Sequence, residues 1–222
     1  VVCLMSGVID SPVAAFRLMK RGCSVMPVHF HSYPFLSRAS QEKVRELTEV
    51  LTRNQMRTTL KLVPFGELQR QVVLSVPSPM RVIVYRRLMM RIADRIARDN
   101  RARALVTGEV IGQVASQTLE NLSVIDSATS LPVLRPLVGM DKEEIVLEAQ
   151  RIGTYEISIV PDQDCCQLFT PRSPETHARF WQVEQAEAKL PIEAMVKAAL
   201  DGTVTESFGF PDREGAENAE VE

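Results

Sequence analysis

Four residues near the start of the chain combine hydroxyl, glycine and carboxylate chemistry at a spacing that suits phosphate. Ser6 and Gly7 follow an apolar run at residues 1–5, and Asp10 and Ser11 precede a helical pattern. A turn that leads into a helix favours an anion, because its unpaired N–H groups and the helix dipole point at the ligand. Asp10 would fit there if a magnesium ion bridged it to the phosphate. An ordinary strand–turn–helix connection explains the same residues.

Val8 is the unexpected residue of this turn. A β-branched side chain disfavours positive φ and adds bulk where backbone should approach a phosphate. If the position requires glycine geometry, the strain would cost about 1–3 kcal/mol. We then expect a displaced phosphate and lower turnover, without loss of the fold.

The composition is that of a soluble globular chain with an uneven distribution of charge. The 222 residues are 45% hydrophobic and 24% charged, with a net charge of −2. Between Arg81 and Arg103 there are eight arginines and two aspartates. This segment is either a solvated helix face or an arginine-rich ridge that meets phosphate. From Asp201 onward, seven acidic residues accompany only Arg213, which predicts a frayed acidic tail.

Cysteine usage and hydropathy predict a cytoplasmic protein without a membrane partner. No apolar stretch approaches the roughly 20 residues that a bilayer span needs. The four cysteines contain no CxxC pair and are too few for a disulfide framework, so we expect a reducing compartment. Cys3 and Cys23 lie in or beside predicted strands and are expected in the core.

Apolar patterning alternates between strand and helix along most of the chain. It predicts strands at 1–5, 24–30, 58–65, 104–109 and 131–137, and helices at 12–21, 37–54, 66–75, 79–99 and 141–153. Such alternation indicates an α/β fold, a doubly wound, mostly parallel sheet with helices on both faces. From Pro171 the pattern is helical, and after Thr205 it predicts disorder. Ligands of such sheets bind at the carboxyl ends of the strands, where the strand order reverses.

Six segments occur in an order that resembles one known family. They are SGVIDSPVAAFRLMKRG, PVHFHSYP, YRRLMMRIA, TGEVIGQVASQT, LRPLVGMDKEEI and DCCQLFTPRSP. The first resembles the SGGxDS loop of PP-loop ATP pyrophosphatases, which cleave ATP between the α and β phosphates. Together they resemble the catalytic domain of tRNA 4-thiouridine synthetases, the ThiI family. The resemblance implies a PP-loop, adenine nucleotide alpha-hydrolase-like domain at residues 1–190. Residues 191–222 match no part of the family, and their pattern predicts a C-terminal helical extension ending in a partly disordered acidic tail.

The resemblance also implies a reaction and the residues that carry it. Family members use ATP and Mg²⁺ to adenylate O4 of uridine 8 in tRNA, and sulfur then displaces AMP; some also supply sulfur for the thiazole of thiamine. Asp10 and Lys142 match catalytic positions, and Cys165 matches the cysteine that exchanges disulfides with a persulfide donor. Cys166 is the weaker alternative. The matching ATP contacts are Leu4, Met5, Ser6, Gly7, Ser11, His29, Phe30, Arg86, Gly108 and Gln117.

Lys142 also stands out without the family. It would lie at the start of the helix that Asp141 and Glu144 cap, where a cation opposes the helix dipole. A residue placed against its local electrostatic preference hints at function.

The resemblance further implies partners. Family members carry a ferredoxin-like region and a THUMP domain ahead of the catalytic domain, and these grip the tRNA. In this sequence, tRNA would dock through a missing or separate module, or through the ridge at Arg81–Arg103. A cysteine desulfurase or another persulfide donor would supply sulfur, and a homodimer is a further expectation. Two alternatives stand beside this interpretation: a PP-loop adenylating enzyme with another acceptor, and a degenerate nucleotide-binding domain without turnover.

Overall fold

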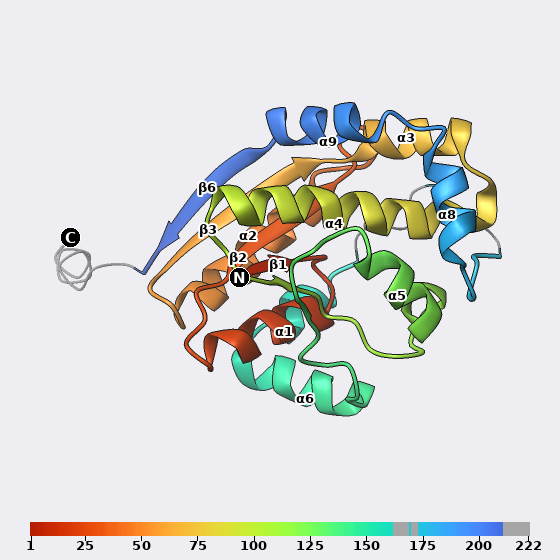
Figure 1. Ribbon diagram of the computed structural model, residues 1–222. Coiled ribbons are helices and arrows are strands. Elements are labelled where there is room, and N and C mark those ends of the chain that lie inside the picture. Colours follow the sequence, from red (N-terminus) through yellow and green to blue (C-terminus); the bar gives the residue numbers. More distant parts are fainter. Residues whose placement is uncertain (162–168, 170–172, 211–222) are drawn as a thin grey trace, which may run out of the picture.

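A six-stranded sheet forms the centre of the molecule, described here by a computed structural model over residues 1–161, 169 and 173–210. The strand order is β5-β4-β1-β2-β3-β6. β1 to β5 are parallel to their neighbours, and β6 is antiparallel to β3 (Figure 1). The strands are β1 (Val2–Leu4), β2 (Met26–His31), β3 (Arg57–Pro64), β4 (Leu105–Val106), β5 (Val133–Leu134) and β6 (Val204–Gly209).

Helices cover both faces of this sheet, which confirms the predicted doubly wound α/β class. One face packs against α3 (Gly66–Ser75), α4 (Arg81–Asp99), α5 (Leu119–Asp126), α8 (Phe180–Glu187) and α9 (Ile192–Asp201). The other packs against α1 (Asp10–Met19), α2 (Ala39–Thr52) and α6 (Lys142–Ile152), with the short α7 (Tyr155–Ser158) beside α2 and α6. Within the described part of the chain, no helix is both long and apolar enough to cross a bilayer.

Successive residues of the central strand face the two helical layers in turn. Val2 belongs to the core on the α4 side, whereas Cys3 belongs to the core on the α1 side. Burial raises the pKa of the Cys3 thiol to about 12, so this cysteine is a core residue as predicted. Cys23 is half-buried and packs against the same cluster.

The predicted helices agree with the structure more closely than the predicted strands. The helix expected at 66–75 is α3, and the one expected at 79–99 begins with a 3₁₀ turn at Ser78–Met80 and continues as α4. β4 and β5 are only two residues long. The sequence patterns did not predict α5, which begins after Thr118, whose hydroxyl accepts a hydrogen bond from the Asn121 N–H at 3.2 Å.

The prediction of disorder after Thr205 is wrong for residues 206–209, which belong to β6. This strand is mostly exposed, so it lacks the apolar alternation that would reveal it in the sequence. Pairing with β3 and an ion pair between Arg45 and Glu206 at 2.7 Å stabilise it. The boundary predicted at residue 190 stays a prediction, but α9 adds side chains to the same core as α4.

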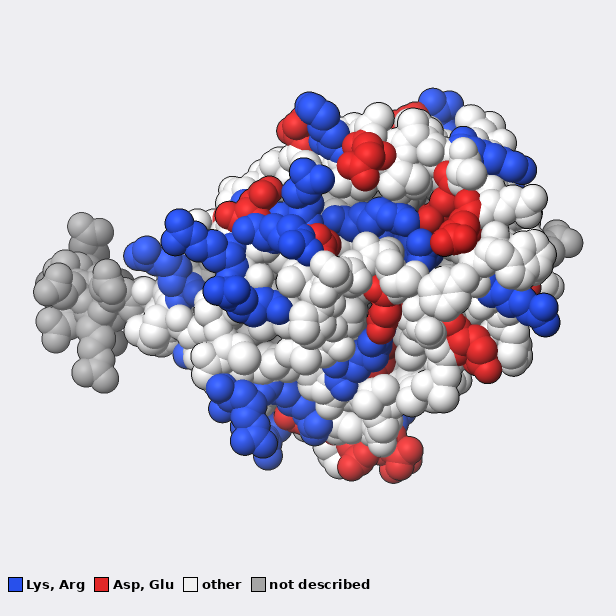
Figure 2. All heavy atoms as spheres, viewed as in Figure 1, with Lys and Arg blue, Asp and Glu red and all other residues white. Residues whose placement is uncertain are grey.

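The arginines of α4 are mostly bound within the chain. Arg87 and Arg91 both pair with Glu187 of α8, and Arg87 also donates to the Val124 carbonyl of α5. The solvated-face prediction is therefore wrong for Arg87, which is 5% exposed. Arg81, Arg86 and Arg98 also donate to acceptors within the chain. Lys and Arg atoms still gather along α4 on the surface, interspersed with acidic groups (Figure 2).

Replacing Glu187 with Gln should lower the free energy of unfolding by about 1–2 kcal/mol at neutral pH, because the two arginines lose a charged acceptor. Burial alone would raise the pKa of Glu187, but hydrogen bonds and charges from Arg91 and Arg87 outweigh it and lower the pKa. A lowered folded-state pKa contributes stability above the unfolded-state pKa and loses it as pH falls through the folded value. Urea unfolding from pH 7 to pH 3 should therefore show the gap between wild type and Glu187→Gln closing in acid.

Candidate active site

The principal candidate site lies at the carboxyl ends of β1, β2 and β4. The chain runs from β1 to β2 and β3 on one side, then returns to place β4 on the other side of β1, so the strand order reverses there. A cavity of about 410 Å³ opens at this point. Nine of the predicted site residues line it: Leu4, Met5, Ser6, Asp10, Ser11, Phe30, Arg86, Gly108 and Gln117.

The turn after β1 has the conformation expected of a phosphate loop. Gly7 adopts a φ of +85°, a left-handed conformation that favours glycine. The Ser6 N–H donates to the Ser11 hydroxyl at 3.0 Å, and the two hydroxyl oxygens lie 3.1 Å apart. α1 begins at Asp10, so the loop and the N–H groups of the first helical turn face the same end of the cavity. Gly7 shapes this loop but does not line the cavity.

Val8 does not carry the strain that its side chain led us to expect. The described non-glycine residues with positive φ are Met56, Arg101 and Phe169. Val8 is 40% exposed and lines the cavity, so its bulk points into open space beside the loop. The loop residue that adopts the left-handed backbone conformation is Gly7, one residue earlier. Val8 therefore gives no reason to expect impaired turnover.

If the cavity has the ATP pyrophosphatase activity that the family resemblance implies, a Val8→Gly variant should release pyrophosphate at the wild-type rate, because this position of the loop does not require glycine geometry. The measurement is the steady-state rate of pyrophosphate release at saturating ATP. A gain of tenfold or more would show that Val8 does restrain the loop.

The two predicted catalytic groups of opposite charge meet at this cavity. Lys142 Nζ lies 2.7 Å from Asp10 Oδ1, across 132 residues of sequence. Gln113 Nε2 donates to the other carboxylate oxygen, Oδ2, at 3.3 Å. Asp10 is buried and lines the cavity, whereas Lys142 is half exposed and is not among the residues that line it. The ammonium group is thus held beside the phosphate loop and still accessible to a ligand.

α6 presents Lys142 from its first turn, as the sequence predicted. Asp141 is the N-cap residue, and its N–H donates to Glu144 Oε2 at 2.9 Å in a capping box. Gly153 ends the helix with a φ of +78°. The acidic side chains of the first turn offset the unfavourable placement of the cation at the positive end of the helix dipole.

Met5 lines the cavity, and the buried His29 supports the Met5 backbone. The Met5 N–H donates to the Val28 carbonyl at 2.8 Å, and the Met5 carbonyl accepts from His29 Nδ1 at 2.8 Å. His29 is fully buried, contacts Ser40 through Nε2 at 3.2 Å and does not line the cavity. The structure therefore places His29 where it supports the backbone of the phosphate loop.

Gly108 allows β4 to approach the phosphate loop. A Cβ atom at this position would lie 2.8 Å from the Asp10 carbonyl carbon and 2.8 Å from the Ser11 nitrogen. These are backbone atoms, which cannot move aside as the end of a long side chain can. Gly108 thus lines the cavity and also sets the distance between the end of β4 and the start of α1.

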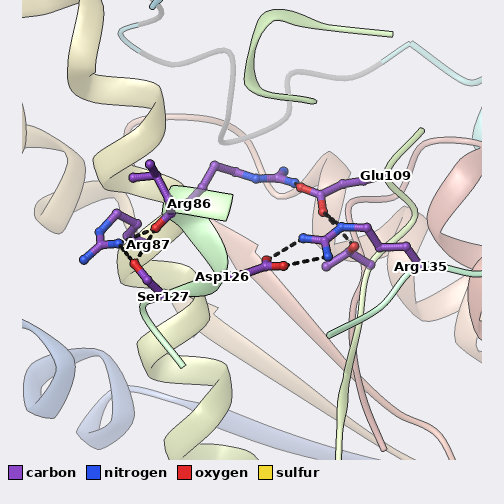
Figure 3. A network of polar contacts seen from close by, with 8 residues as sticks. Arg86, Arg87, Glu109, Asp126, Ser127 and Arg135 are labelled. Atoms are coloured by element: carbon purple, nitrogen blue, oxygen red, sulfur yellow. Dashed lines mark hydrogen bonds and ion pairs between the residues drawn. The ribbon is translucent and has the colours of Figure 1, made fainter. Parts of the chain in front are cut away.

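Glu109, the acidic residue that follows Gly108, was not predicted from the sequence. Glu109 lines the cavity at 3% exposure, with Arg86 and Arg135 as ion-pair partners (Figure 3). Burial alone would raise the pKa of Glu109, but the charges of Arg86 and Arg135 outweigh it and lower the pKa. The available signal was its place in TGEVIG at a strand end, but its partners come from distant segments. Gln113 was not predicted either, because its partner, Asp10, also comes from a distant segment.

The predicted sulfur-transfer residue, Cys165, and its neighbour Cys166 lie outside the described residues, so this role stays a prediction. The described chain before them is anchored beside the loop. Lys43 of α2 donates to the carbonyl oxygens of Ser158 and Val160, and its side chain lies next to Gly7.

Comparisons with known proteins agree with this geometry. A profile of the family described as Thiamine biosynthesis protein (ThiI) matches residues 1–192. A protein of Thermus thermophilus described as "Probable tRNA sulfurtransferase" is 54% identical over 213 residues, which cover 96% of this chain and 52% of that protein.

Solved structures extend the comparison. A crystal structure of a 4-thiouridine synthetase–RNA complex with bound ATP is 45% identical, with a TM-score of 0.89 over 93% of this chain and 54% of that one. NMN synthetase from Francisella tularensis, at 14% identity and a TM-score of 0.57, covers 97% of this chain and 80% of its own and shares the fold. This chain therefore spans about half the length of the first two relatives.

Proposed function

The chain belongs to the ThiI family, and on that premise we propose that it catalyses the ATP-dependent thiolation of tRNA. In this reaction O4 of uridine 8 attacks the α-phosphorus of ATP, the bond to the bridging oxygen breaks and pyrophosphate leaves. Sulfur then displaces AMP to give 4-thiouridine. The observation that carries the proposal is the ion pair between Asp10 and Lys142 at the phosphate loop.

ATP is the nucleotide that the cavity would take. The relative with bound ATP, 45% identical over most of this chain, supports this assignment. Phosphates would lie at Ser6, Ser11 and the first turn of α1, where N–H groups and hydroxyls converge. The adenine ring would lie against the apolar part of the lining, which includes Phe30, Val82 and Met89.

A magnesium ion fits Asp10. Mg²⁺ is usually held by one or two carboxylates together with substrate phosphates and water. Asp10 lines the cavity with a carboxylate whose oxygens retain lone pairs beside the contacts to Lys142 and Gln113. Among the described residues, no group of three or more His, Cys, Asp or Glu side chains could hold a metal by itself. When bound, the ion would neutralise phosphate charge.

Lys142 and Asp10 would then have different roles in adenylation. Lys142 stabilises the negative charge that develops on the phosphate oxygens as pyrophosphate leaves. Asp10 holds the ammonium group at 2.7 Å and so limits where Lys142 can reach. Cys165 remains our candidate for the thiol that takes part in sulfur delivery from a persulfide donor such as a cysteine desulfurase.

Pyrophosphate release from ATP, measured with and without unmodified tRNA, tests this proposal. We expect release stimulated by tRNA and lost when uridine 8 of the tRNA is replaced by cytidine. Release that requires a different acceptor would instead support another PP-loop adenylating enzyme. ATP binding without release under any of these conditions would indicate a nucleotide-binding domain without turnover.

A further inference from the structure

Four charged side chains form one continuous series that runs from the cavity to a half-exposed carboxylate at the end of α5. We call them the Glu109 network: Arg86, Glu109, Arg135 and Asp126 (Figure 3). Arg86 comes from α4, Glu109 follows β4, Arg135 follows β5 and Asp126 ends α5. Arg86 and Glu109 line the cavity, whereas Arg135 and Asp126 do not.

The carboxylate of Glu109 is oriented without help from Arg86. Its Oε2 accepts from the Thr107 hydroxyl at 2.8 Å and from Arg135 Nε at 2.8 Å. These two donors fix the plane of the carboxylate and leave Oε1 for Arg86. Glu109 is therefore a fixed acceptor, and Arg86 is the side chain that adapts to it.

Arg135 is likewise held from its other side. Its Nη1 and Nη2 donate to the two oxygens of Asp126 at 2.9 and 2.5 Å, a bidentate geometry that fixes both the position and the plane of a guanidinium group. Thus Asp126 positions Arg135, Arg135 positions Glu109, and Glu109 positions Arg86. Such layered support restrains a functional side chain more tightly than a single surface ion pair does.

A carboxylate in a cavity for a polyanion needs an explanation, because its charge repels phosphate. The charge of Glu109 is offset by two guanidinium groups, and the carboxylate itself is almost fully buried. Its repulsion is therefore small at the ligand, whereas its hold on Arg86 acts at the cavity wall.

We propose that Glu109 is a positioning residue, which holds the Arg86 guanidinium at the cavity wall in the orientation that meets the phosphates of ATP. This inference rests on the proposed function, because it takes ATP as the ligand of the cavity. Arg135 acts indirectly, by orienting Glu109, and Asp126 acts by orienting Arg135.

A double-mutant cycle on ATP affinity tests this role. Glu109→Gln should weaken equilibrium ATP binding about tenfold, since it removes the charge that orients Arg86 and keeps the volume. Arg86→Ala should weaken binding at least as much. The double variant should bind ATP no more weakly than Arg86→Ala alone, because Glu109 acts only through Arg86. Unchanged or tighter binding by Glu109→Gln, or losses that multiply in the double variant, would overturn the proposal.

Glu187→Gln is a matched control, because Glu187, like Glu109, is a buried carboxylate paired with two arginines, in this case Arg87 and Arg91 of α4. It lies outside the cavity lining, so it should reduce stability but leave ATP affinity unchanged at 20 °C. Asp126→Asn should weaken ATP binding less than Glu109→Gln does. If wild type binds ATP and releases pyrophosphate while Glu109→Gln behaves the same, only this inference fails. If wild type does not bind ATP, the proposed function fails.

Discussion

In the proposed reaction, replacing Lys142 with Met should lower tRNA-stimulated pyrophosphate release by about 10²–10³-fold, the usual effect of losing one preorganised group that stabilises transition-state charge. The side chain of Met has similar length and no charge, and Lys142 is half exposed at the first turn of α6, so the fold should survive. The measurement is kcat at saturating ATP and tRNA. ATP affinity should change much less than kcat, because this charge matters most as pyrophosphate leaves.

Lys197→Met is the matched control, since Lys197 also forms an ion pair with an aspartate, Asp201, at 2.5 Å, but on α9 and away from the cavity. It should keep wild-type turnover. Equal losses in both variants, or a Lys142→Met enzyme with wild-type kcat, would remove Lys142 from the chemistry.

Replacing Gly108 with Ala should cost about 3 kcal/mol of unfolding free energy, at the upper end of the range for overpacked sites. The added Cβ would meet the backbone of Asp10 and Ser11 at 2.8–2.9 Å, so either β4 or the phosphate loop must move. Movement of the loop would also separate the N–H groups that we propose bind phosphate. Thermal unfolding with and without ATP should show a lower melting temperature and a smaller stabilisation by ATP.

Gly139→Ala provides the comparison. A Cβ atom at Gly139 would have no heavy atom within 4 Å, and its φ lies outside the left-handed region. Its melting temperature and its response to ATP should match those of wild type. A Gly108→Ala protein with wild-type stability would mean that the end of β4 and the start of α1 tolerate a wider separation.

The parts of the site that could be predicted are those whose residues lie close together in the sequence. The phosphate loop, Asp10 and the capped helix that presents Lys142 each have a local pattern, and the parallel sheet brings the strand ends together. The support of Arg86 was not predictable, because Glu109 and Arg135 come from two other segments and have no periodic signature. Val8 was misjudged for a related reason: the required φ falls on Gly7, and only the backbone geometry shows it.

The partners of the arginines between Arg81 and Arg103 could not be predicted from the sequence either. Counting charges predicted either a solvated face or a ridge for phosphate, because a sequence does not show which carboxylates approach a helix. Glu187 lies 100 residues from Arg87 and still pairs with it at 2.9 Å. α5 and β6 escaped prediction because a short helix and an exposed edge strand depend on their neighbours more than on their own pattern.

The antiparallel pairing of β6 with β3 also determines how the chain tolerates shortening. β3 is eight residues long, and β6 pairs along it from Arg57 to Leu62. A chain cut at residue 192, where the family profile ends, would leave the N–H and C=O groups of β3 unpaired at the border of the sheet. An open edge of this kind templates aggregation. β6 therefore protects the solubility of the catalytic fold, although it contributes nothing to the lining of the cavity.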